Sequence, residues 1–128
     1  METNNNTLSS QYDTNYEKTP NKNEIKKNLL KNLKEFSKLY NQYYIKMNKA
    51  NRSYKGMLVQ ALIKDLFNTC IDDFYLVNEP KFDRFNNLLW KLEFTLTDLY
   101  GCGIIKKRPR KNLAVFTNTM KNLLKSVK

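Results

Sequence analysis

The stretch 80–105 constrains the fold more than any other part of the chain, because its apolar residues keep one helical spacing. Asn78 and Pro80 suit the start of a helix, while Gly101 and Gly103 suit its end. A helix with so wide an apolar stripe must bury it against other helices. Steps of three or four residues place the stripe on one helical face. It consists of Phe85, Leu88, Leu89, Leu92, Leu96 and Leu99.

Three further stretches carry helical spacing. Pro109 suits the first turn of the last one. The apolar residues expected to face inward are Ile25, Leu29, Leu33, Phe36, Tyr40, Tyr43 and Met47 in the first stretch and Leu113, Phe116, Met120, Leu123, Leu124 and Val127 in the last. In the first, Thr19 and Pro20 are expected to cap the helix and begin its first turn, and Ser53 is expected to cap the second. The second helix has apolar residues on more than one face, which indicates several neighbours or an oligomer interface. Only three glycines and three prolines interrupt the chain, which disfavours a sandwich or barrel. The sequence therefore predicts an all-α, antiparallel up-down four-helix bundle, with helices near 20–49, 53–78, 80–104 and 109–127.

The first nineteen residues differ from the rest. They are rich in Asn, Ser and Thr and have no apolar period, so we expect a disordered polar tail over 1–19. The remaining residues, 20–128, are expected to form a single bundle domain, since a chain of 128 residues can build one core.

The charge of the chain is strongly basic and unevenly placed. Lys and Arg number 23 against 12 Asp and Glu, giving a net charge of +11. Residues 21–55 and 106–128 each carry +8, whereas 1–20 carry −2 and 56–105 carry −3. A basic excess in the first and last helices favours a polyanion partner, RNA or DNA, over a membrane surface. A solvated basic face with no partner remains the alternative.

The turn at 106–111 concentrates five positive charges at the start of the last helix. That placement opposes the helix dipole, so it is not there to stabilise the helix. An anionic partner would meet both the side chains and the free backbone N–H groups. The first and last helices are neighbours in an up-down bundle, so their basic segments are expected to merge into one surface. The candidate nucleic-acid-binding residues are Lys26, Lys27, Lys31, Lys34, Lys38, Arg52, Lys55, Lys106, Lys107, Arg108, Arg110 and Lys111.

Catalysis is not expected. The chain has no histidine, no glycine-rich phosphate loop and no metal-ligand spacing, so we expect a non-enzymatic protein without cofactor or metal. Cys70 and Cys102 are expected to be core or near-core thiols in a reducing cytosol. No apolar run approaches the length of a membrane span, and a cytoplasmic protein without a membrane role is expected.

Residues 24–125 resemble the accessory variability determinants (Avd) of diversity-generating retroelements. The resemblance covers four basic helices of the lengths predicted above. It also covers the stretch 75–105, which is followed by a basic turn and a short fourth helix. The most telling residues are Arg84, Leu88, Leu89, Leu92, Leu96, Leu99, Ile104, Met120 and Leu124. It implies a homo-pentameric, positively charged barrel that binds the element's reverse transcriptase and template RNA or cDNA and supports mutagenic cDNA synthesis. A structural or protein-interaction bundle with no direct nucleic-acid role is the alternative.

Overall fold

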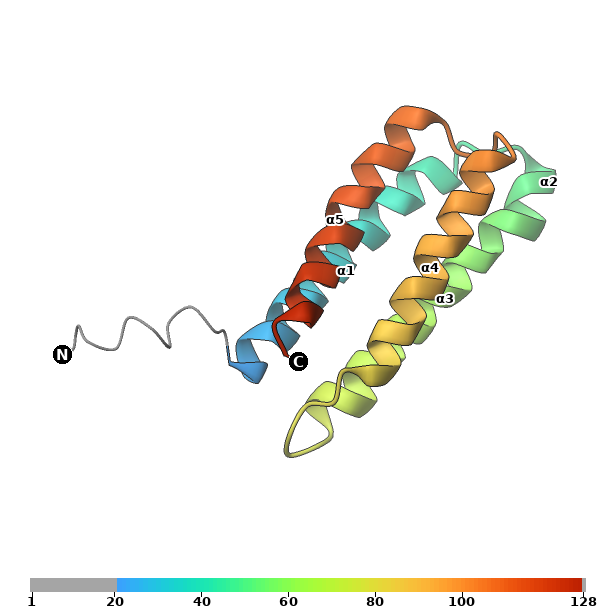
Figure 1. Ribbon diagram of the computed structural model, residues 1–128. Coiled ribbons are helices and arrows are strands. Elements are labelled where there is room, and N and C mark those ends of the chain that lie inside the picture. The colour runs from blue at the N-terminus through green and yellow to red at the C-terminus, as the bar shows by residue number, and fades with distance from the viewer. Residues whose placement is uncertain (1–20, 128) are drawn as a thin grey trace.

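The computed structural model describes residues 21–127, which form helices joined by short turns (Figure 1). No strand occurs among these residues, so the expected all-α class with four helical stretches is confirmed. The predicted disordered tail, 1–19, lies outside the described residues. The elements are α1 (Lys22–Tyr44), α2 (Lys49–Asn51), η3 (Arg52–Gly56), α3 (Met57–Thr69), η4 (Cys70–Tyr75), α4 (Asp83–Gly101) and α5 (Lys107–Lys125), where η denotes a π-helix.

The helices pack as two closely contacting pairs around one core. Figure 1 shows α1 lying alongside α5, and α3 alongside α4. Contacts of α4 with α5 and of α1 with α3 join the two pairs. The core consists mainly of the apolar seams expected from the sequence. Its buried residues include Ile25, Leu29, Leu33, Phe36 and Tyr40 of α1, Phe85, Leu89, Leu92, Leu96 and Leu99 of α4, and Leu113, Met120 and Leu124 of α5.

The first two predicted helix starts were misplaced, because asparagine side chains cap both helices. The Asn21 side chain accepts a hydrogen bond from the Glu24 N–H (2.8 Å), so α1 begins at Lys22. The expected cap, Thr19, lies outside the described residues. Asn48 accepts from the Asn51 N–H (2.9 Å) and starts the second helical stretch, so the predicted cap Ser53 lies inside that stretch. Both caps satisfy N–H groups that a helix end leaves unpaired.

The first helix ends at Tyr44, not near residue 49, and the fourth stretch, α5, begins at Lys107. The third helix begins at Asp83, not at Pro80. Pro80 is buried in the connection before this helix. A proline favours extended backbone in the residue that precedes it. The ring of Phe74 lies 5.1 Å from that of Phe82 and 5.5 Å from that of Phe85 (centroid to centroid), which holds the connection against the core.

The second helical stretch runs over 49–75 and widens into a π-helix on both sides of α3. In η3, the Gly56 carbonyl accepts from the Tyr40 hydroxyl (2.8 Å), and the Arg52 carbonyl accepts from the Tyr44 hydroxyl (3.3 Å). Gly56 is required by close approach, since a Cβ there would lie 3.0 Å from the Asn51 carbonyl oxygen and 3.0 Å from the Tyr44 ring.

Residues of α3 face the core in a pattern that the sequence analysis did not single out. Val59 and Ile63 are buried, whereas Met57 and Leu58 are about half exposed. Three apolar residues in a row, 57–59, do not show which of them faces inward. The expectation that this stretch is apolar on more than one face is confirmed by the exposed side chains of Met57, Leu58 and Ile71. Among the described residues, none of the helices is long and apolar enough to cross a membrane.

Candidate nucleic-acid interface

Four lysines of α1 form an exposed row opposite its buried seam. Lys27, Lys31, Lys34 and Lys38 are all exposed, and their spacing of four, three and four places them on one helical face. The row is about 16 Å long at 1.5 Å per residue. Within residues 21–127, Lys38 is the one member that pairs with a carboxylate, 3.9 Å from Glu35 on the exposed surface. We refer to these four residues as the outer lysine stripe.

Lys26 does not belong to this stripe. Its ammonium group donates to the Phe74 carbonyl (3.3 Å) and lies 4.4 Å from the centre of the Tyr75 ring. These contacts tie α1 to η4. Lys26 therefore has a packing role that its position in the sequence did not reveal.

A second group of cations gathers at one end of the molecule, the upper end in Figure 1, where α1 ends and α5 begins. Six exposed cations from three separate segments meet there: Lys46 after α1, Lys49 of α2, and Lys106, Lys107, Arg108 and Lys111 at the start of α5. We refer to these six residues as the basic end. Within residues 21–127, none of the six makes an ion pair.

Lys46 and Lys49 were not among the residues expected to bind. The first helix was expected to continue to residue 49, but it ends at Tyr44 and the chain turns back there. Lys46 and Lys106 now line the same cavity. Their proximity is a consequence of tertiary structure, since sixty residues separate them along the chain.

The start of α5 has little local compensation for its charge. Its N-cap residue, Lys106, makes no capping hydrogen bond through its side chain, and its first turn contains no acidic residue. Pro109 lies in this first turn, as expected. The lack of a side-chain cap and the positive side chains both favour an anion at this helix end.

Two expected binding residues are occupied elsewhere. Arg110 bonds to Glu93 and donates to the Thr97 hydroxyl (3.2 Å), with a side chain only 16% exposed. Lys55 donates to an Asp98 oxygen (3.1 Å) and to the Cys102 sulfur (3.4 Å). These contacts raise the pKa of Lys55, first through the hydrogen bond to Asp98 and then through that to Cys102. Both side chains therefore tie their own helical segments to α4.

Glu93 is the centre of a partly buried ionic cluster between α4 and α5. Its side chain is 18% exposed and lies against Arg110 and Lys121, the latter at 3.4 Å. Burial raises the pKa of this carboxyl group, but the bond and charge of Arg110, helped by Lys121, outweigh burial and hold the pKa below its ordinary value. The cluster removes Arg110 and Lys121 from the surface available to a polyanion.

The basic end and the outer lysine stripe follow one another along α1. The Asn112 side chain donates to the Tyr43 hydroxyl (3.2 Å), which places the start of α5 against the end of α1. Residues 39–45, between the two groups, carry no charge. From Lys38 to the end of α1 at Tyr44 the helical rise is about 9 Å. A single strand would have to run lengthwise along α1 to reach both groups. Arg52, the remaining candidate, is half-buried in η3.

The two cysteines lie in different surroundings. Cys70 is buried, and this burial raises the pKa of its thiol to about 12. Cys102 is exposed at the end of α4, so the expectation of a core or near-core thiol is wrong for this residue. It follows Gly101 where the helix turns away from the core, and Gly103 adopts a positive φ of 78°. Residues 21–127 contain no group of three His, Cys, Asp or Glu side chains that could hold a metal ion.

Large apolar side chains line a second surface, between α3 and α4. Phe94 is 78% exposed and Trp90 54% exposed. With Leu58, Ala61 and Leu62 they border an open groove of about 540 Å³. Exposed apolar side chains gathered at one groove form a candidate contact surface. We refer to these five residues as the apolar groove.

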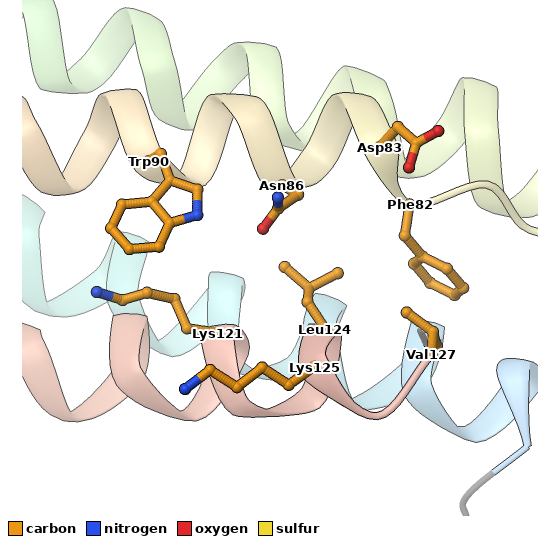
Figure 2. A pocket seen from close by; sticks show the side chains of 8 residues that line it. All are labelled: Phe82, Asp83, Asn86, Trp90, Lys121, Leu124, Lys125 and Val127. Atoms are coloured by element: carbon orange, nitrogen blue, oxygen red, sulfur yellow. The ribbon is translucent and has the colours of Figure 1, made fainter.

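Trp90 also borders a smaller groove of about 300 Å³ between α4 and α5. Figure 2 shows Trp90, Asn86 and Asp83 on one side of it, with Lys121, Leu124 and Lys125 on the other. The Lys121 ammonium group lies 4.4 Å from the centre of the indole ring. Trp90 therefore packs against α5 on one side while it borders the apolar groove on the other.

Comparison of the chain with protein-family models, with curated proteins and with solved structures found no match. The charges, contacts and exposed surfaces of residues 21–127 are what bear on function.

Proposed function

We propose that this protein is a non-enzymatic nucleic-acid-binding protein that contacts phosphate groups through its basic end and outer lysine stripe. The observation that carries the proposal is the basic end itself, where six cations from three segments gather without an ion pair among residues 21–127. Like charges at one end of a molecule repel one another, and a polyanion would relieve that repulsion.

Binding of this kind is driven largely by counterion release. Each phosphate contact makes the log–log slope of affinity against salt concentration steeper by about 0.7 to 0.9. Phosphate contacts position a nucleic acid but do not read its sequence, so the protein should bind RNA and DNA with little preference for sequence.

The finer architecture and the biological setting are part of the same proposal. The four helices form an antiparallel up-down bundle, supported by the pairing of α1 with α5 and of α3 with α4. By its resemblance to the Avd family, the protein is an accessory subunit of a retroelement reverse transcriptase. It binds template RNA or cDNA and supports mutagenic cDNA synthesis. The free thiols of Cys70 and Cys102 support a cytoplasmic location.

Self-association is also part of the proposal, with a pentamer as the assembly that the resemblance implies. The apolar groove supports it, since Phe94 and Trp90 would lose their exposure to water against a second copy. A purely structural or protein-interaction role is the second candidate, and the same groove favours it.

The test is a charge-removal experiment with a matched control. The binding variant replaces Lys106, Lys107, Arg108 and Lys111 by Gln, and the control replaces the exposed Lys64, Lys81, Lys91 and Lys125 by Gln. Fluorescence anisotropy with single-stranded RNA and with duplex DNA measures affinity over a range of salt concentrations. We expect the binding variant to reduce the log–log slope by about three, while the control changes it by less than about one. Equal losses in both variants, or no loss in either, would overturn the proposal.

A further inference from the structure

A cavity of about 260 Å³ opens at the basic end, between the end of α1 and the turn that leads into α5. Its walls are mainly apolar and include one aromatic ring. The lining residues are Tyr43, Lys46, Met47, Ile104, Ile105, Lys106 and Pro109. It is therefore an apolar recess within the surface that we propose for phosphate binding.

The walls of this recess are held by hydrogen bonds. The N–H groups of Ile104 and Ile105 both donate to the Leu99 carbonyl, at 2.9 and 3.3 Å. On the opposite side, the Tyr43 hydroxyl accepts from Asn112 (3.2 Å), and the Met47 N–H donates to the Tyr44 carbonyl (3.1 Å). The recess is preformed, so a ligand would meet little cost of ordering it.

The chemistry of the recess selects a flat apolar group with a negative charge beside it. Lys46 and Lys106 are exposed residues that line the cavity, and lysines lay their stems along apolar surface while the ammonium groups stay in water. The volume lies just below the range of about 300–1,000 Å³ typical of small-molecule pockets. It suits one ring system, with any attached phosphate left outside near the ammonium groups.

We propose that this recess binds one unpaired nucleobase, so that the nucleic acid held at the basic end is single-stranded. The inference rests on the proposed function and specifies its ligand. In a duplex, the bases are stacked and paired, and one would have to be flipped out to enter. In a single strand, the base enters against Tyr43 while its flanking phosphates meet Lys46 and Lys106. The apolar groove between α3 and α4 offers no such pairing of charges, since Lys91 is the one cation of the described residues that lines it.

The test compares two single strands that differ only in their bases, with a duplex as a third probe. A thymidine strand of about twelve nucleotides is compared with an abasic strand of equal length and with a duplex. At one salt concentration, we expect the thymidine strand to bind about tenfold more tightly than the abasic strand, as stacking on an aromatic side chain predicts. The salt dependence of the two single strands should be equal, because their phosphates are the same.

A pair of variants locates the effect. Tyr43→Leu should reduce the tenfold advantage to less than about twofold while leaving the salt dependence unchanged. Tyr54→Leu is the control, since Tyr54 is a 69% exposed aromatic residue on η3 that does not line the recess.

The outcomes separate the two proposals. If thymidine and abasic strands bind equally and with steep salt dependence, phosphate binding stands and the base-binding recess is wrong. If the duplex binds as tightly as the thymidine strand, the recess is likewise wrong. If no probe binds, the proposed function itself fails. An equal loss in Tyr43→Leu and Tyr54→Leu would show that the recess is not the site of stacking.

Discussion

At the scale of single residues, Glu93 shows how the fold assigns roles to charged side chains. Its carboxylate joins Arg110 and Lys121 of α5 to α4 in a partly buried cluster. One oxygen, Oε1, is buried and receives no hydrogen bond within the described residues, although Lys121 lies 3.4 Å away. The interaction with these two cations stabilises the ionised form, so the stability of the protein should depend on pH.

The substitution Glu93→Gln tests this dependence. The pKa of Glu93 is lowered in the folded protein. The stabilisation is therefore fully present above the unfolded pKa of about 4.3 and is lost as the pH falls through the lower folded value. We expect Glu93→Gln to lower the free energy of unfolding by about 1–3 kcal/mol at pH 7, and the difference to shrink near pH 3.

Urea unfolding at both pH values measures the difference. Glu79→Gln serves as the control, since Glu79 pairs with Lys22 on the exposed surface and such pairs contribute little. A deficit of the Glu93 variant that is the same at pH 7 and pH 3 would contradict the electrostatic explanation.

At the scale of elements, η3 depends on the absence of a side chain at Gly56. A Cβ at this position would lie 3.0 Å from the Asn51 carbonyl oxygen, 3.0 Å from the Tyr44 ring and 3.1 Å from the Met47 sulfur. We expect Gly56→Ala to destabilise the protein by about 1–3 kcal/mol, because the neighbours must move to admit the methyl group.

Gly101→Ala is the matched comparison, since a Cβ at that helical position meets nothing within 4 Å. It should be neutral or stabilise the protein by up to about 1 kcal/mol. Thermal unfolding followed by circular dichroism measures both variants. Equal effects at the two glycines would show that the close approach at Gly56 is not limiting.

The sequence predicted which residues of most helices face the core, but not where every helix ends. The spacing of Ile25, Leu29 and Leu33 is local information, and it was sufficient to identify the buried seam of α1. The start of α4 at Asp83 depends instead on Phe74 packing against Phe82 and Phe85, a contact between separate elements. The periodicity of one segment cannot reveal a contact between two segments.

The candidate site could be predicted only in part for the same reason. The exposed cations at 106–108 and 111 follow from local sequence alone. The engagement of Arg110 with Glu93, and of Lys55 with Asp98, depends on which helices become neighbours. The position of Lys46 and Lys106 at the same cavity depends on it as well.

At the scale of the whole molecule, the apolar groove should determine the state of association. We expect the protein to assemble beyond its monomer mass of 15.3 kDa, since Phe94 and Leu58 are exposed apolar side chains that line the same groove. The double substitution Leu58→Glu and Phe94→Glu should yield a monomer, because burying two charges in an interface is strongly unfavourable.

Multi-angle light scattering at micromolar concentration measures the mass of each form. Val115→Glu is the control, since Val115 is 60% exposed on α5 and lies outside the groove. A parent protein that is already monomeric would contradict self-association, as would a double variant that keeps the parent's mass.

The π-helix η3 also has a consequence for how the chain can vary in length. A π-helical turn holds one residue more than an α-helical turn. Deleting one residue within 52–56 would convert the wide turn into ordinary α-helix and leave α3 in register with α4. The same deletion in the middle of α4 would rotate all later residues of that helix by about 100° and turn its apolar stripe away from the core. Single-residue deletions among related chains should therefore be tolerated at η3 and excluded from the middle of α4.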